Sequence, residues 1–212
     1  MTAATLELLS PVQQVRAGRF PRRFVQLILG LVLYGATLGT LIRSGLGNAP
    51  WDVLHQGLAR HLPLSIGTLI IIVSLIVLVL WIPIREVPGL GTLCNAFLIG
   101  LSADATLSVL HQPDSMALRI LMVVVGVVGN AVATAYYIGA QLGPGPRDGL
   151  MTGLHRRTGL PIGRVRTALE ITVVVIGWIL GGTLGVGTVL YAVCIGPIVQ
   201  RLLPYAIVPL RR

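Results

Sequence analysis

The sequence predicts an all-α polytopic membrane protein with about six transmembrane helices, arranged as two inverted-topology repeats of three helices each. Three observations predict it: long apolar runs, arginines concentrated on one side, and an internal repeat. The chain has 212 residues and a mean hydropathy of +0.86, with 54% hydrophobic and 11% charged residues. A soluble domain of this length could not bury so much apolar surface, so we expect these runs to lie in a bilayer.

A helix needs about 20 residues to cross about 30 Å of membrane hydrocarbon. Six runs meet this requirement: 24–42, 66–84, 90–110, 118–140, 165–184 and 186–203. They are too long and too continuously apolar for the strands of a membrane barrel. The first run is also longer than the core of a cleavable signal, so we expect it to be retained.

Arginine supplies all 16 basic residues and predicts the orientation. Arg43, Arg60 and Arg119 follow one side of the predicted bundle, and the other thirteen follow the opposite side. Basic loops stay in the cytoplasm, so both termini are expected there and the number of spans is even. The net charge of +9 therefore reflects membrane topology and indicates no nucleic-acid partner.

The internal repeat appears when the chain is shifted by 96 residues. Eighteen of the 54 positions from 47 to 100 are then identical, and they include matched glycine, proline and aspartate residues. Three spans per unit is an odd number, so the second copy must enter the membrane from the opposite side. We expect a basic N-terminal segment over 1–22, a first repeat over 23–112 and a second over 116–208, together forming one membrane domain.

Each repeat carries a polar segment between its first and second spans, at 45–58 and 141–154. Glycine and proline end the preceding helix, and proline suits the first turn of the next one. We therefore expect a short half-helix in each segment, either re-entrant or interfacial, facing its counterpart. The residues expected to break the helices are Gly45, Gly47, Pro50, Gly143, Gly145 and Pro146.

Ionisable residues in or near the spans are candidate ligands for a solute or an ion, because they are costly at membrane depth. The candidates are Asp52, His55, Asp104, Arg147, Asp148 and Glu170. Alternatives stay open for each: the first-turn aspartates Asp52 and Asp148 could cap helices, and Glu170 could pair with Arg166 at i, i+4. Asn95, Asn130, Tyr136 and Tyr137 are expected to form interhelical hydrogen bonds.

The sequence contains no recognisable motif for a metal site, a cofactor site or a catalytic centre. Cys94 and Cys194 both lie in apolar runs without the spacing of a metal site, so we expect no metal and no cofactor. The chain has no HExxH pair, nucleophile elbow or phosphate-binding loop. The sequence therefore favours a protein that is not an enzyme, although an aspartate pair could still perform acid–base chemistry.

The paired motifs at 45–58 and 143–154, with Gly89-Leu90-Gly91-Thr92 and Gly185-Val186-Gly187-Thr188, resemble the YczE/YitT-type family of bacterial integral membrane proteins. The resemblance covers nearly the whole chain after about residue 20. It implies a bacterial cytoplasmic membrane and, because that family is largely uncharacterised, it supplies no binding or catalytic residues.

The leading functional hypothesis is a small-solute transporter or permease with a polar site at the repeat interface. It follows by analogy with transporters built from inverted repeats. Two alternatives remain, a membrane scaffold that binds a partner protein and an intramembrane enzyme. Besides the lipid bilayer and an unidentified solute, the sequence is compatible with a homodimer, because six short helices make a thin wall around a pathway.

Overall fold

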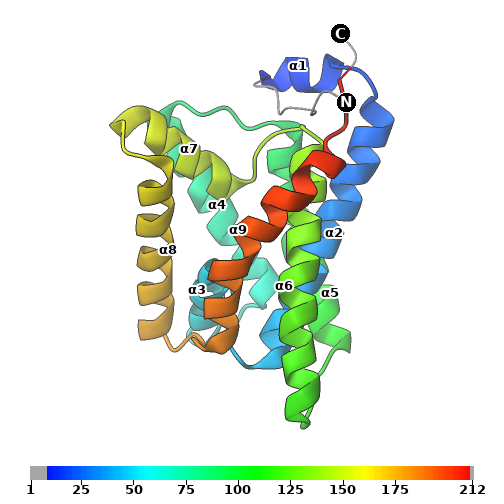
Figure 1. Ribbon diagram of the computed structural model, residues 1–212. Coiled ribbons are helices and arrows are strands. Elements are labelled where there is room, and N and C mark those ends of the chain that lie inside the picture. Colours follow the sequence, from blue (N-terminus) through cyan, green and yellow to red (C-terminus); the bar gives the residue numbers. More distant parts are fainter. Residues whose placement is uncertain (1–8, 211–212) are drawn as a thin grey trace.

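A computed structural model describes residues 9–210 as helices joined by short loops, without a β-strand in that part of the chain (Figure 1). The helices are α1 (Pro11–Arg16), α2 (Phe20–Ser44), α3 (Pro50–Ala59), α4 (Ile66–Ile84), α5 (Leu90–Val109), α6 (Met116–Gly139), α7 (Pro146–Thr158), α8 (Ile162–Ile179) and α9 (Val186–Ala206). The first eight residues of the predicted N-terminal segment, together with Arg211 and Arg212, lie outside the described residues.

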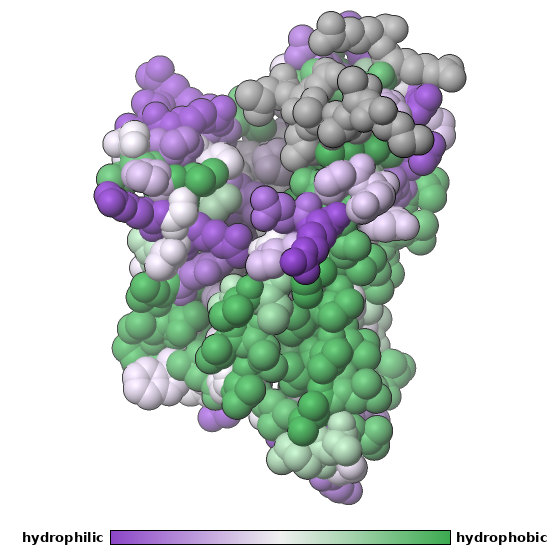
Figure 2. All heavy atoms as spheres, in the orientation of Figure 1, coloured by the Kyte–Doolittle hydropathy of each residue, from purple (hydrophilic) through white to green (hydrophobic). Residues whose placement is uncertain are grey.

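Five of the described helices are long and apolar enough to cross a membrane: α2, α4, α5, α6 and α9. Each corresponds to a predicted span. The remaining predicted span, 165–184, is not confirmed, because α8 carries Arg164, Arg166 and Glu170 and ends at Ile179. Figure 2 shows the apolar surface as a broad green band, with hydrophilic residues concentrated above it.

The helices form two groups around two hydrophobic clusters. The larger cluster joins α2, α5, α6 and α9 and includes Leu27, Leu31, Val127 and Ile195. The smaller cluster centres on Trp81 of α4 and gathers partly buried residues of α3, α7 and α8. Helix α4 also packs along α5 and joins the groups on one side, whereas α8 and α9 make scarcely any contact on the other.

The helix starts follow the sequence repeat. Helices α2 to α5 begin at residues 20, 50, 66 and 90, and α6 to α9 begin at residues 116, 146, 162 and 186, each 96 residues later. In Figure 1, α2, α5 and α8 run away from the end of the molecule where α1 and α7 lie, and α6, α9 and α4 return toward it. Corresponding long helices therefore run in opposite directions.

The contacts between helices also follow the repeat. Helix α2 packs on α5 as α6 packs on α9, and α3 packs on α8 as α7 packs on α4. Two backbone hydrogen bonds join equivalent positions of the two halves. The Gly91 N–H donates to the Leu142 carbonyl at 2.6 Å, and the Gly187 N–H donates to the Leu46 carbonyl at 2.9 Å. These bonds hold each helix-breaking segment against the start of a helix in the other half.

Arg23 and Arg119 fasten α2 and α6 to each other at both ends. Arg23 is fully buried, and its guanidinium donates to the carbonyls of Ala140 at 2.8 Å and Gln141 at 2.6 Å, just past the end of α6. Arg119 donates in turn to Ser44 at 2.7 Å, the last residue of α2. Terminal helix carbonyls have no partner within their own helix, so each arginine satisfies groups that would otherwise be orphaned.

Candidate functional site

The two short helices begin as the sequence predicts. Pro50 and Pro146 occupy their first turns, where a missing N–H costs nothing. Gly45 ends α2 in a left-handed conformation, and Gly145 is the N-cap residue of α7. Gly47 at φ 123° would bring a Cβ to 2.8 Å from the Thr188 backbone nitrogen. A larger residue there would push the segment off α9.

Gly143 is the counterpart of Gly47 and adopts nearly the same conformation, with φ 119°. Its position against Gly89 and Thr92 leaves a Cβ only 3.2 Å from the Gly89 Cα. All six predicted helix-breaking residues therefore lie at a helix start, a helix end or a close backbone approach.

The first turns of α3 and α7 meet through Trp51 and Arg147. The guanidinium carbon of Arg147 lies 4.9 Å from the centroid of the Trp51 ring, which is a cation–π contact. The two residues are 96 positions apart, so they occupy equivalent positions in the two halves. Two residues that are equivalent in the sequence repeat therefore meet where the two halves touch.

Two small cavities adjoin this contact. The first, of about 90 Å³, lies among α2, α4, α5, α6, α7 and α9. Its polar lining residues are Tyr34, Ser74, Asn95, Thr134, Tyr137, Arg147, Asp148 and Tyr191. The second, of about 60 Å³, is lined by Trp51, Met151, Arg166, Leu169 and Glu170, and again by Arg147 and Asp148. Arg147 and Asp148 thus form the wall that the two cavities share.

Each aspartate of the repeated motif has one specific side-chain partner. Asp148 accepts a short hydrogen bond from the Tyr137 hydroxyl. Asp52 lies 3.0 Å from His55 Nδ1, and both side chains are fully buried. The residue equivalent to Tyr137 is Leu41, and the residue equivalent to His55 is Met151. The halves therefore hold corresponding carboxylates by different means.

The Asp52–His55 pair keeps two polar atoms without a partner. Asp52 Oδ2 and His55 Nε2 are buried, and neither has a hydrogen-bond partner among the described residues. Buried polar groups are almost always satisfied, so an unsatisfied pair indicates a functional group or a bound water molecule. Neither carboxylate of the repeated motif accepts a backbone N–H from its own helix start within residues 9–210; the bonds of both are to side chains.

Tyrosine and asparagine side chains form hydrogen bonds between the helices around the first cavity. Tyr34 lines this cavity together with Arg147 and Asp148. Tyr191 donates to Asn130 Oδ1 at 2.8 Å, and Asn130 donates through its amide to Thr37 at 3.1 Å. The predicted interhelical hydrogen bonds are thereby observed for Asn130 and, through Asp148, for Tyr137.

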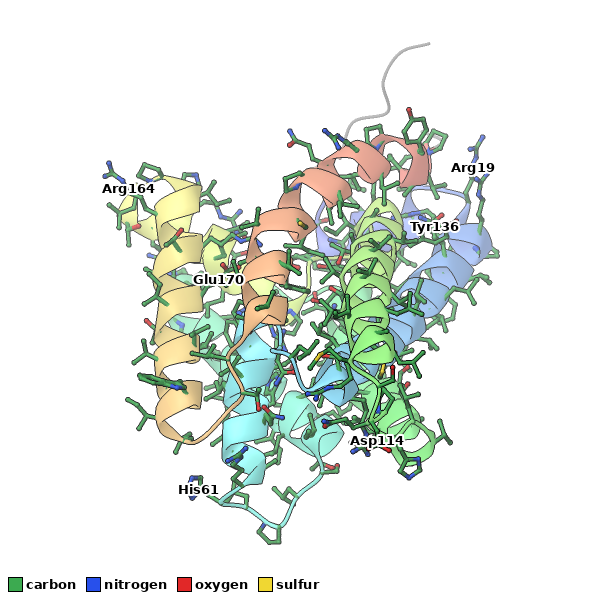
Figure 3. All side chains as sticks on the ribbon, turned by 60° about the horizontal axis from the view of Figure 1, so that its bottom comes forward. Arg19, His61, Asp114, Tyr136, Arg164 and Glu170 are labelled. Carbon is green, nitrogen blue, oxygen red and sulfur yellow. The ribbon has the colours of Figure 1, made fainter. Side chains whose placement is uncertain are left out.

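Tyr34 and Tyr191 are site residues that sequence reasoning missed. A signal for both existed in the repeat, because Tyr34 is equivalent to Asn130 and Tyr191 is equivalent to Asn95. Positions that are polar in both copies of a membrane repeat face the interior of the bundle. Tyr136 differs from Tyr137 in this respect: it lies on the exposed surface near the end of α6 (Figure 3).

Asp104 lies away from both cavities. Its carboxylate accepts from the Gly67 backbone N–H at 2.7 Å and from the Ser65 hydroxyl. Both donors are at the start of α4, so Asp104 of α5 satisfies the free N–H groups at this helix end. The structure gives Asp104 a structural role in joining α4 to α5.

Glu170 forms the predicted i, i+4 pair, with Arg166 Nε 2.8 Å from its carboxylate. Both residues also line the second cavity. Figure 3 shows Glu170 on the side of α8 that faces α9. Arg164, Arg166 and Glu170 make α8 less apolar than the five candidate spans. Two of these residues, Arg166 and Glu170, line the second cavity of the candidate site.

Within residues 9–210, no three His, Cys, Asp or Glu side chains gather as a metal site would require. Cys94 and Cys194 are unpaired thiols of intermediate exposure. The chemistry available at the site consists of two guanidiniums, three carboxylates, one imidazole and several hydroxyl and amide groups. These groups suit the binding of a small polar solute or a proton.

Long apolar helices with ionisable groups enclosed between them define a multi-pass helical membrane protein. The chain belongs to the family of unknown function DUF6198, whose profile matches residues 21–204. It is 35% identical to the uncharacterised membrane protein YczE of Bacillus subtilis over 181 residues, 84% of each chain. This relative confirms the resemblance predicted from the repeated motifs.

Two further relatives are also uncharacterised. A Haemophilus influenzae protein is 40% identical over 174 residues, 82% of this chain and 80% of that protein. Bacillus subtilis YyaS is 29% identical over 185 residues, 82% of this chain and 92% of that protein. No solved structure matches the chain significantly. The family therefore supports a multi-pass membrane protein and assigns no activity.

Proposed function

We propose that this protein is a small-solute transporter or permease, built as an inverted-topology repeat with its binding site at the repeat interface. The observation that carries the proposal is the position of Arg147 and Asp148. They form the common wall of two cavities at the point where the equivalent residues Trp51 and Arg147 touch. Inverted-repeat transporters hold their substrates at such an interface.

Support for the inverted repeat comes from helix starts spaced by 96 residues and from contacts that exchange between the halves. The repeat requires α8 to be a sixth crossing. An amphipathic helix can cross a bilayer when its charged face lies against a wet cavity inside the protein. Arg166 and Glu170 line the second cavity, which fits this requirement.

The proposed orientation has both termini in the cytoplasm of a bacterial cell. Arg16, Arg19 and Arg22 lie at the start of the first span, and Arg156 and Arg157 lie at the end of α7. Figure 1 places α1 and α7 at the same end of the molecule, where the positive-inside rule puts the cytoplasm. The second cavity is lined by residues of α3, α7 and α8 and shares Arg147 and Asp148 with the first cavity.

We assign roles within the site by chemistry. Arg147 presents a guanidinium that can hold a carboxylate or another anionic group of a solute, and Asp148 with Tyr137 can accept an amine or hydroxyl group. Asp52 and His55 can exchange a proton, because each retains one unsatisfied buried atom. Glu170 and Arg166 line the approach from the α7 end.

A thermal-shift screen tests the proposal, because a ligand that binds only the folded protein raises its melting temperature. Purified protein would be scanned against amino acids, small carboxylates, alkylamines and inorganic ions. A shift that is present in the wild type and lost in Asp148→Asn supports the site. Asp114→Asn, an exposed loop aspartate labelled in Figure 3, is the matched control and should keep the shift.

Flux of the identified solute into proteoliposomes then separates transport from binding alone. Uptake that needs Asp148 supports a permease. A melting temperature that responds to no pool, in wild type and variant alike, would contradict a solute site at the repeat interface and favour a partner-binding scaffold.

A further inference from the structure

A pair of glycines holds α4 against α5 in the first half of the molecule. A Cβ placed on Gly67 would lie 2.1 Å from the Gly100 carbonyl oxygen, and a Cβ on Gly100 would lie 2.4 Å from the Gly67 carbonyl oxygen. No side chain fits at either position. The two helix backbones are in direct contact, which is the close approach that small residues permit in membranes.

The same pair exists in the second half but is not in contact. Gly163 of α8 and Gly196 of α9 are the residues 96 positions later. A Cβ on either glycine would meet no heavy atom within 4 Å. Helices α8 and α9 stand apart in both Figure 1 and Figure 3. Gly163 and Gly196 thus match the contact glycines of the first half, but α8 and α9 do not touch through them.

Glycine within a helix costs roughly 1 kcal/mol relative to alanine, so a glycine without a close neighbour gains nothing in this conformation. Other equivalent positions show the same difference. Ala96 of α5 is fully buried, whereas Ala192 of α9 is exposed. Two small residues of α9, Ala192 and Gly196, therefore lack the close neighbours that Ala96 and Gly100 have in α5.

The facing side of α8 is polar. Arg166 and Glu170 occupy the positions of Ile70 and Ser74, which are buried in α4. Charged groups at membrane depth face protein or a wet cavity, and lipid would be an unfavourable neighbour for them. The space between α8 and α9 is consequently suited to water that enters and leaves the candidate site.

We propose that the protein has a second conformation, in which α8 docks on α9 through Gly163 and Gly196 as α4 docks on α5 here. In that conformation α4 separates from α5, and the opening of the central site moves to the opposite face of the membrane. The inference rests on the proposed transport function, because exchange of the two halves' conformations around a fixed site is alternating access. In this second conformation, the helix that covers the free face of α8 is α9 of the same chain.

Disulfide trapping measures the docking directly. Gly163→Cys and Gly196→Cys would be combined in a chain whose Cys94 and Cys194 are replaced by alanine, then oxidised in proteoliposomes. A disulfide needs a Cα–Cα separation of about 4.4–6.8 Å, a range the two positions reach only if α8 approaches α9. We expect more than half of the thiols to become resistant to a maleimide–polyethylene glycol label.

The matched control pair combines Ala168→Cys with Gly196→Cys. Ala168 is exposed on α8, and its counterpart Ile72 stays 37% exposed even in the docked half. This pair should remain fully labelled after oxidation. Equal labelling of both pairs after oxidation would overturn the proposed conformation and would leave the space between α8 and α9 as a permanent vestibule.

A blocking variant separates this inference from the proposed function. Gly163→Leu fits the open space, so its melting temperature and its response to solute should match the wild type, whereas solute flux should fall about tenfold or more. Ala168→Leu should keep wild-type flux. Normal flux in Gly163→Leu would contradict the docking and leave transport intact, whereas trapping without any solute response would support the docking and contradict transport.

Discussion

The contact between α4 and α7 and the contact between α8 and α3 occupy equivalent positions in the sequence repeat but use different side chains. In one junction, Trp81 of α4 lies over Gly149 of α7, and its indole N–H donates to the Pro146 carbonyl at 3.0 Å. In the other, the position of Trp81 is Gly177 in α8, and the position of Gly149 is Val53 in α3. A Cβ on Gly177 would lie 2.5 Å from the Val53 carbonyl carbon.

The comparison shows that equivalent helix contacts can be made by different pairs of residues. Exchanging a large residue and a small one across a contact keeps the volume between the helices nearly constant. It changes the distance between the helices, since α8 touches α3 through backbone whereas α4 touches α7 through an indole. The two halves can therefore hold different conformations of one architecture at the same time.

The largest expected effect follows from removing the indole. Trp81→Ala empties a fully buried site, because Trp81 is 1% exposed, and it also deprives the Pro146 carbonyl of its donor. Truncation of a buried tryptophan costs about 3–5 kcal/mol. We expect a large fall in the melting temperature in detergent. Trp178→Ala, which removes an exposed indole from α8, is the control and should change stability little.

The second prediction concerns the different side-chain partners of Asp52 and Asp148. His55→Met gives α3 the residue that α7 carries at the equivalent position, Met151, and leaves Asp52 buried without its partner. Removing one member of a buried pair costs about 3 kcal/mol. The melting temperature should fall in His55→Met and recover when Asp52→Asn is added. An unchanged melting temperature in His55→Met would contradict a stabilising role for the pair.

The third effect compares the two arginines that cap α6 and α2. Arg23→Ala removes three good hydrogen bonds from a fully buried guanidinium, including one to the Gln14 carbonyl at 2.6 Å. Arg119 is only partly buried. We expect a cost of about 2–3 kcal/mol for Arg23→Ala and about 1 kcal/mol for Arg119→Ala, measured by thermal unfolding. Equal costs would argue against burial as the cause of the difference.

The smallest effect concerns Thr92 and Thr188, whose hydroxyl groups bind different backbone groups of the opposite half. Thr188 accepts from the Asn48 N–H at 3.1 Å, and Thr92 donates to the Pro144 carbonyl at 2.7 Å. Thr92→Val and Thr188→Val should each cost about 1 kcal/mol. Replacing Thr188 by alanine as well would show whether the hydroxyl or the methyl group matters.

The repeat predicted the helix starts and the short helices because their signals are local. Pro50 and Pro146 fix the first turn, and Gly47 and Gly143 adopt backbone conformations that few other residues reach. Arg147, Asp148 and Glu170 were identified as candidates because charge at membrane depth is rare. The structure places these three on the two cavities.

The packing of α8 could not be predicted in the same way. Identity between the halves suggests identical contacts, yet the separation of α8 from α9 depends on positions that differ, such as Ile70 and Arg166. The hydrogen bonds of Asp104 could not be predicted for a related reason. Its partners, the Gly67 N–H and Ser65, come from another helix, and no local pattern in the sequence records that approach.

Thr92 and Thr188 show why a hydroxyl group suits equivalent positions that meet different neighbours. A hydroxyl group can donate or accept, so threonine serves at both positions although the residue opposite is Asn48 in one half and Pro144, which has no N–H, in the other. A side chain that only donates or only accepts would have tied the two copies to the same neighbour. A group that can both donate and accept thus lets equivalent positions bind different partners while the contact between the two halves is kept.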